Sequence, residues 1–429
     1  MKRIKIDLVN SRVVRNASWL VGGKLVNMVL AFFIGLLTAR YLGPNNYGLI
    51  NYATAYVTFF ASLCTLGINS VIVKEFIDFP DEEGETIGTT LVLRSISSMA
   101  SALMICGFSL IIDRKEPLTI IVVALCSLSL VFQVFDTFNY WFQAHLQSKC
   151  SAIAITVSYI VLSIYRLILL LLGCSVEWFA FASSVDYIAI AVALLLFYKS
   201  KGGPKMSFSS NKAKRLLSNG CHFILSGLMV SIYGSTDKLM IKQLLDESSV
   251  GYYSTALGLC NIWTFVLAAI IDSMYPVIME ERNRNYNNYL KRNRQLYAIV
   301  FYLSFIVSLI FSIFGSFFIN LLYGKAYLPA AYPLRIITWY VAFSYLGVAR
   351  NAWIVSENKQ KYLVIIYIGA AVINIVLNAI LIPLIGTIGA ATASLITQIS
   401  TVVCIPFFIK ELRTNAKMMI QAIFLKDVF

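Results

Sequence analysis

Charged side chains inside long apolar stretches are the residues of this 429-residue sequence that could do chemistry. A charge near the centre of a bilayer costs several kcal/mol, so each of these residues is a candidate for binding or ion transfer. Seven of them are basic and four are acidic, and this excess of cations favours a pathway that attracts an anion. They are Lys24, Arg94, Asp136, Arg166, Asp186, Asp237, Lys238, Lys242, Asp272, Arg335 and Arg350.

The basic members of this set are candidates for binding an anionic cargo in a cavity. Arg166 stands among leucines and isoleucines, where a partner inside the protein is favoured over contact with lipid. Lys24 shares a helix face with Asn27. Snorkelling to the membrane surface is the alternative for Lys24, Arg94 and Arg350. We predict six substrate-binding cations: Lys24, Arg94, Arg166, Lys238, Lys242 and Arg350.

Three aspartates are predicted to couple an ion or to balance a charge. Asp136, Asp237 and Asp272 could each face an arginine on another helix or accept a proton. Asp237 follows Tyr233 by four residues, which places both on one helical face. A polar collar at the outer end of that helix is the alternative. The coupling cation would be Na+ or H+, and no other cofactor is expected.

Motifs of enzymes and metal sites are missing from the sequence. The eight cysteines form no CxxC pair and only two histidines are present, so no metal site is predicted. GxxxxGK[ST], HExxH and GxSxG patterns do not occur. We therefore predict that the protein is not an enzyme.

The elements that must position these charges are membrane helices. Hydrophobic residues make up 59% of the chain and charged residues 13%, and the mean hydropathy is +0.76. Apolar blocks near 20 residues long are typical of membrane-spanning helices. We predict an all-α, polytopic membrane protein with about twelve spans, at 17–39, 47–73, 87–112, 118–141, 151–172, 177–198, 217–244, 252–279, 296–322, 332–354, 362–383 and 388–409.

The distribution of Lys and Arg between the predicted loops gives the orientation. The two termini and alternate loops hold 24 of these residues, whereas the opposite loops hold four. Positive residues stay in the cytoplasm, so both termini are predicted to be cytoplasmic. The net charge of +14 follows this loop pattern, and nucleic acid is not expected as a partner.

The chain divides into two halves at the basic loop 199–216, with six spans on each side. The segment 41–55 resembles 244–256, and each joins the first two spans of its half. Repeated halves are typical of transporters. We predict an N-terminal lobe at 1–205 and a C-terminal lobe at 206–429 with a short cytoplasmic tail.

Several motifs resemble the bacterial polysaccharide (O-antigen type) flippases, a family of the multidrug/oligosaccharidyl-lipid/polysaccharide exporter superfamily. The resemblance covers nearly the whole chain. It implies two six-helix lobes around a central cavity, with alternating access between the two sides of the membrane. The matching segments are Asn16–Leu20, Gly35, Ala39–Pro44, Tyr47–Gly48, Asn51–Ala53, Leu66–Ile68, Asp237–Met240, Val250–Ser254 and Gly386–Ala391.

The resemblance also implies a function in surface polysaccharide biosynthesis. The cargo would be an undecaprenyl-pyrophosphate-linked oligosaccharide repeat unit, carried across the bacterial cytoplasmic membrane. Further expected partners are membrane lipids and polysaccharide polymerase machinery, and a monomer is expected. A multidrug/cation antiporter of the same superfamily is the alternative, although such a protein should have more acidic than basic cavity residues. A glycan polymerase or ligase would need large loops, which this sequence lacks.

Overall fold

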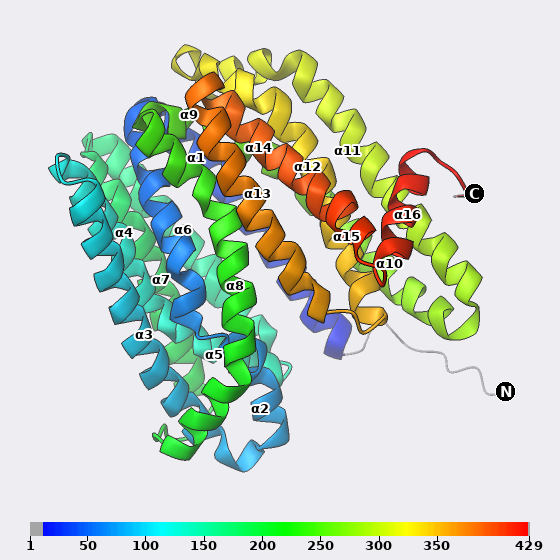
Figure 1. The fold of residues 1–429 in the computed structure, drawn as a ribbon. Helices are drawn as coiled ribbons and strands as arrows, with labels where there is room; N and C mark the ends of the chain where they lie inside the picture. Colours follow the sequence, from blue (N-terminus) through cyan, green and yellow to red (C-terminus); the bar gives the residue numbers. More distant parts are fainter. Residues whose placement is uncertain (1–11, 428–429) are drawn as a thin grey trace. The chain divides into compact units, whose positions relative to one another are not determined.

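The computed structural model describes residues 12–427, except for the side chains of residues 12–21, 24, 25, 70, 222, 226 and 283. Within 12–427 the chain is helical and contains no strand, which confirms the predicted all-α fold (Figure 1). The predicted spans fall mostly on helix, although 47–73 and 252–279 each contain a non-helical turn. The helices of the first half are α1 (Arg12–Thr65), α2 (Ile72–Asp78), α3 (Glu83–Ile112), α4 (Pro117–Gln133), α5 (Thr137–Ala144), α6 (Ser148–Leu172) and α7 (Val176–Ser200). Those of the second half are α8 (Ser210–Leu244), α9 (Glu247–Asn261), α10 (Thr264–Arg284), α11 (Tyr286–Tyr323), α12 (Ala331–Ser356), α13 (Lys361–Ile385), α14 (Thr387–Ile399), α15 (Ile405–Phe408) and α16 (Arg413–Ile423).

The lengths of these helices suit a membrane. Eight helices in the described part of the chain are long and apolar enough to cross a bilayer, or up to ten if each of two bent pairs is one span. The first helix contains the predicted span 17–39 and most of the span 47–73. Its backbone breaks between them, at Gly43 (φ 69°, ψ 173°), immediately before Pro44. A positive φ is readily adopted by glycine, and proline cannot continue the preceding helix.

The chain folds into two compact units. The first unit comprises residues 1–41 and 56–231, and the second comprises 42–55 and 232–429. This boundary lies inside α8, whereas the sequence predicted it at 205/206. The segment 42–55 also belongs to the second unit, although it precedes most of the first unit in the chain.

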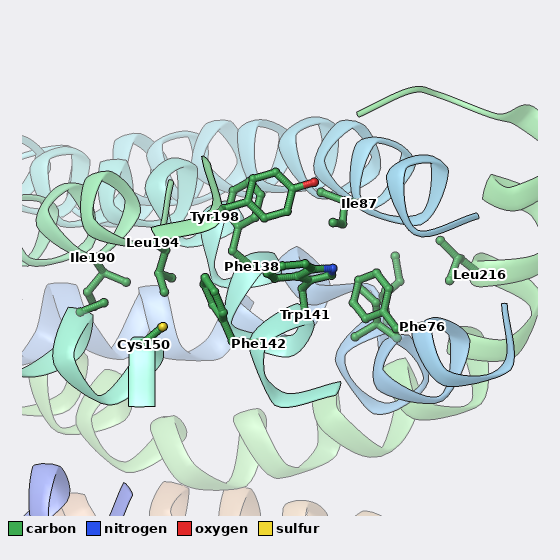
Figure 2. Close-up of a cluster of buried hydrophobic side chains, with 13 residues drawn as sticks. Phe76, Ile87, Phe138, Trp141, Phe142, Cys150, Ile190, Leu194, Tyr198 and Leu216 are labelled. Carbon is green, nitrogen blue, oxygen red and sulfur yellow. The ribbon is translucent and has the colours of Figure 1, made fainter. Parts of the chain in front are cut away.

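Aromatic side chains form a core in the first unit (Figure 2). The rings of Phe138 and Tyr198 are 4.7 Å apart, and the ring of Trp141 lies 5.0 Å from that of Tyr198. The indole Nε1 of Trp141 donates to Glu83 Oε2 at 2.8 Å. The core thus ties α5 to α7 and to the first turn of α3.

The basic loop that divides the sequence is held against the first unit. The backbone N–H of Ser207 donates to Gly84 O at 3.2 Å, and a Cβ on Gly84 would lie 2.2 Å from Lys205 O. The predicted loop ends in the first turns of α8, where Lys212 Nζ lies 3.2 Å from Glu75 Oε1 and the Arg215 guanidinium lies 3.9 Å from the Phe79 ring. The loop and the start of α8 are therefore fixed to α2 and α3.

The two similar segments noted in the sequence meet within the second unit. A Cβ on Gly48 would lie 1.8 Å from Glu247 O, and a Cβ on Gly251 would lie 2.2 Å from Pro44 O. Only glycine permits backbones to approach this closely. The shared glycines of the repeat thus bring the start of the second predicted span against the start of α9.

Candidate functional site

A buried carboxylate with four neutral hydrogen-bond donors lies in the second unit. Asp237 Oδ1 accepts from the side-chain amides of Asn374 at 3.0 Å and Asn378 at 2.6 Å. Asp237 Oδ2 accepts from the hydroxyls of Tyr253 and Ser394, both at 2.5 Å. All five side chains are buried, and we refer to these residues as the Asp237 cluster.

Four helices supply the Asp237 cluster. Asn374 and Asn378 are four residues apart and so lie on one face of α13. The chain reverses at Gly386 (φ 63°), after which α14 runs beside α13 (Figure 1). A Cβ on Gly389 would lie 2.2 Å from Leu381 O, so glycine allows the two helices to approach closely. This approach places Ser394 of α14 opposite the two asparagines.

The chemistry of the Asp237 cluster suits a monovalent cation. The four hydrogen-bond donors to Asp237 are all neutral. None of the described residues forms an ion pair with it, although the charge of the neighbouring Lys238 interacts with the carboxylate. Asn378 Oδ1 is buried and accepts no hydrogen bond from the described residues. Carboxylate, amide and hydroxyl oxygens thus converge at one buried place, and one cation would neutralise the carboxylate there.

Two lysines of α8 lie close to this cluster in the sequence and are tied to other groups. Lys238 Nζ donates to Asn51 Oδ1 at 3.4 Å and is half-buried. Lys242 is buried, and its Nζ lies 3.4 Å from Glu247 Oε1 and 5.5 Å from the centre of the Tyr52 ring. Both predicted cations therefore contact the segment 42–55 or the start of α9.

The first unit contains a different arrangement, in which arginines accompany the carboxylates. Arg94 of α3 is 2% exposed and donates to Thr137 Oγ1 at 3.2 Å and to Gln133 O at 3.1 Å. The Arg94 charge also interacts with that of the half-buried Asp136. Arg94 is thus held by α4 and by the start of α5.

The second arginine of the first unit lies near another aspartate. Arg166 of α6 is half-buried, and its charge interacts with that of Asp186 on α7. Asp186 Oδ1 accepts from Ser158 Oγ at 2.5 Å. The charges of Asp136 and Asp186 also interact with each other. We refer to Arg94, Asp136, Arg166 and Asp186 as the first-unit charge group.

Residues 13–282 of the chain match a protein family described as "Polysaccharide biosynthesis protein". This match covers more than half of the sequence. The chain belongs to this family. Residues matched by this family include Asp237 and Tyr253 of the Asp237 cluster, but not the two asparagines or Ser394.

Solved structures of transporters share the fold. The chain is similar to the lipid II flippase MurJ in an inward closed conformation, with 16% identity, a TM-score of 0.71, and coverage of 95% of this chain and 91% of that one. It is also similar to an inward-facing multidrug resistance MATE family transporter of the MOP superfamily, with 15% identity, a TM-score of 0.68, and coverage of 92% and 96%.

A curated relative matches part of the sequence. An uncharacterised membrane protein of Methanocaldococcus jannaschii is 25% identical over 228 residues. The match covers 49% of this chain and 44% of the relative, so the chain spans less than half the length of that protein.

Among the other predicted site residues, Arg350 and Asp272 form no bond with a member of the Asp237 cluster in the part of the chain that the structure describes. Arg350 of α12 is buried and donates to Thr401 O. Asp272 of α10 is exposed, and none of the described residues bonds to it. The Lys24 side chain lies outside the described residues. Of the nine predicted residues, Asp237 alone belongs to the Asp237 cluster, and the cargo-binding roles of the six cations remain predictions.

The sequence reasoning missed four members of the Asp237 cluster because it searched for charges alone. Two asparagines one helical turn apart in the very apolar span 362–383 were a usable signal, since unpaired amides in hydrocarbon are unfavourable. Tyr253 stood inside the Val250–Ser254 motif, and Ser394 follows the glycine- and alanine-rich stretch. Only the folded arrangement brings these residues to Asp237.

Proposed function

We propose that the protein is a flippase that moves an undecaprenyl-pyrophosphate-linked oligosaccharide repeat unit across the bacterial cytoplasmic membrane, for surface polysaccharide biosynthesis. The observation that carries the proposal is the membership of residues 13–282 in the polysaccharide biosynthesis family. The likeness to a lipid II flippase supports it, since that protein is named for a lipid-linked cargo. Alternating access moves the cargo, and the protein acts as a monomer with both termini in the cytoplasm.

An anionic cargo agrees with the excess of basic residues in the spans. Arginine offers a planar fork that matches phosphate oxygens, and lysine offers a compact charge. An anion that moves outward also follows an inside-negative membrane potential, which contributes about 2.3 kcal/mol per charge per 100 mV. Two negative charges would therefore gain about 4–5 kcal/mol at 100 mV. Nucleotide hydrolysis by this chain is not needed.

The coupling cation of this proposal is Na+, and the Asp237 cluster holds it. A proton would need only the carboxylate, whereas this cluster gathers neutral amide and hydroxyl side chains around it. The positive charge of the ion would offset the buried carboxylate, and the residues would bind it through Asp237, Asn374, Asn378, Ser394 and Tyr253. Asn374 and Asn378 would turn their amide oxygens toward the ion, and Asn378 Oδ1 already lacks a donor.

Depletion of the protein tests the flippase proposal. Cells that lack it should accumulate lipid-linked repeat units on the inner leaflet and lose surface polysaccharide, and polymerase machinery should receive no substrate. Expression of the wild-type gene should restore both. Normal surface polysaccharide after deletion, in a strain without a redundant flippase, would contradict the proposal.

Two cation substitutions test the binding of the cargo. Lys24→Ala and Arg166→Ala should reduce export while the protein still inserts in the membrane, because each removes a charge that the pyrophosphate would meet. Membrane abundance, measured by immunoblot, is the control. Wild-type export by both variants would mean that these charges snorkel or pair within the protein and do not bind the cargo.

A multidrug/cation antiporter is the second candidate, and the likeness to MATE family transporters favours it. Such an antiporter would protect an efflux-deficient host from cationic drugs. The flippase proposal expects no such protection. Drug accumulation in that host, with and without the expressed protein, separates the two functions.

A further inference from the structure

A π-helical turn follows α14 and interrupts the last predicted span. Residues Ser400–Cys404 form this turn, and α15 continues from Ile405. A π turn is wider than an α turn and frequently lies at a functional site. It also changes the hydrogen-bond pattern of the helix, so a carbonyl near the turn can accept from another element.

Glycines on two neighbouring helices lie against this part of the last predicted span. A Cβ on Gly369 of α13 would lie 2.8 Å from Ile405 Cδ1, the flexible end of the side chain that follows the π turn. A Cβ on Gly347 of α12 would lie 3.7 Å from Val402 Cγ2, an ordinary packing distance. The π turn is therefore packed against α12 and is followed by a contact with α13.

Arg350 binds the π turn from α12. Its guanidinium donates to the carbonyl oxygen of Thr401, and the side chain is 3% exposed. No carboxylate of the described residues forms an ion pair with Arg350, and its Nε is buried without an acceptor. A buried charge held by one carbonyl is unfavourable. Packing alone gives no reason for an arginine there.

A chain of contacts links this turn to the Asp237 cluster. Thr401 Oγ1 donates to Gln398 O at 2.9 Å, and Gln398 Nε2 donates to Tyr233 Oη. Gln398 lies one turn after Ser394 on α14, and Tyr233 lies one turn before Asp237 on α8. The helices that carry Ser394 and Asp237 are thus both connected, through Gln398 and Tyr233, to Thr401, which Arg350 binds.

We propose that Arg350 is a positioning residue, which sets the cation affinity of the Asp237 cluster by holding the π turn. This inference rests on the proposed Na+ coupling. When the cluster binds a cation, Ser394 must turn its hydroxyl oxygen toward the ion, and α14 must adjust. The π turn is the part of that helix that can change its register, and Arg350 fixes one register through Thr401.

The experiment measures Na+ binding by the purified full chain in detergent. Thermal unfolding is followed across a NaCl series, with choline chloride holding the ionic strength constant. Arg350→Gln and Thr401→Val should each change the apparent Na+ affinity at least about fivefold, a typical size for coupling between sites. Arg350→Lys keeps the charge and a donor, so it should restore part of the wild-type affinity.

Thr392→Val is the matched control for Thr401→Val. Thr392 lies on α14, before the π turn, and its hydroxyl donates to the backbone at Ile388 O at 2.8 Å. The Thr401 hydroxyl also contacts the side-chain Oε1 of Gln398 at 3.1 Å, which Thr392 does not. This variant should bind Na+ with wild-type affinity. If Arg350→Gln and Thr401→Val also keep wild-type affinity while Asp237→Asn loses the response, the positioning role is wrong and the Na+ site stands. If the wild type itself gives no Na+ response, the Na+ coupling and this inference are both wrong, and the flippase proposal is judged by the depletion experiment.

Discussion

The two units of this protein bury carboxylates in opposite ways. In the first-unit charge group, Arg94 and Arg166 accompany Asp136 and Asp186, so the protein supplies the compensating charges itself. In the Asp237 cluster, the donors to the carboxylate are all neutral. The charge of Lys238 also interacts with Asp237, so the contrast lies in the four amide and hydroxyl groups that surround this carboxylate. Under the proposed Na+ coupling, these groups and the carboxylate bind an ion from solution.

This difference distinguishes the two sets of charges in the same protein. Arginine beside aspartate makes a locally neutral group that can stay in one state. Under the proposed Na+ coupling, Asp237 exists in two states, with and without a cation, and its amide and hydroxyl neighbours reorient between them. The comparison predicts that substitutions in the Asp237 cluster alter the response to Na+, whereas substitutions of Arg94 and Arg166 leave that response unchanged.

The largest expected effect is on the stability of the first unit. Arg94→Met should lower the free energy of unfolding by about 3 kcal/mol, because it removes the buried guanidinium and its hydrogen bonds and leaves the half-buried Asp136 without a compensating charge. Thermal unfolding in detergent measures the loss. Arg94→Met combined with Asp136→Leu should recover much of the stability, since both buried charges are then gone. Unchanged stability together with lost export would instead support the predicted contact of Arg94 with the cargo.

The next effect concerns the charge of the Asp237 cluster. Asp237→Asn should weaken the Na+ response at least about tenfold, because a neutral amide no longer attracts the ion. The variant should still fold, since no described residue forms an ion pair with Asp237. Na+-dependent thermal stabilisation measures the response. Retention of the full response would place the Na+ site elsewhere and remove the contrast between the two units.

A smaller effect is expected from one neutral member of the cluster. Asn378→Ala removes an amide that donates to Asp237 Oδ1 at 2.6 Å and should change Na+ affinity roughly fivefold. Asn51→Ala is the comparison variant, because Asn51 is also an α-helical amide of the second unit but bonds to Lys238. It should leave Na+ affinity unchanged. Equal effects of the two substitutions would show a general loss of packing.

The sequence predicted the helices of this fold far better than its site. Long apolar blocks predict the helices directly, because a membrane requires helices of a set length. Eight to ten of the described helices are long and apolar enough to be spans, whereas the sequence predicted about twelve. It also identified Asp237, because a charge in an apolar span is conspicuous. It could not give the partners of Asp237, since Tyr253, Asn374 and Ser394 lie far apart in the chain and meet only through close contacts such as that at Gly389.

The unit boundary was beyond sequence reasoning for a similar reason. The basic loop 199–216 separates the sixth and seventh predicted spans, and the sequence therefore predicted a boundary at 205/206. The compact units instead divide inside the continuous helix α8. Hydropathy does not distinguish one half of a helix from the other. The segment 42–55 belongs to the second unit through close backbone contacts at Gly48 and Gly251.

The smallest expected effect comes from the other predicted acid of the second unit. Asp272→Asn should change Na+ affinity less than about twofold, since Asp272 is exposed and no described residue bonds to it. It removes the same charge as Asp237→Asn. A difference between the two variants therefore comes from the position of the aspartate and not from the loss of charge itself. Sodium-dependent thermal stabilisation and export are measured on both variants. If Asp272→Asn abolishes the Na+ response and Asp237→Asn does not, an exposed carboxylate rather than the buried cluster couples the ion, and neutral hydrogen-bond donors no longer mark the functional aspartate.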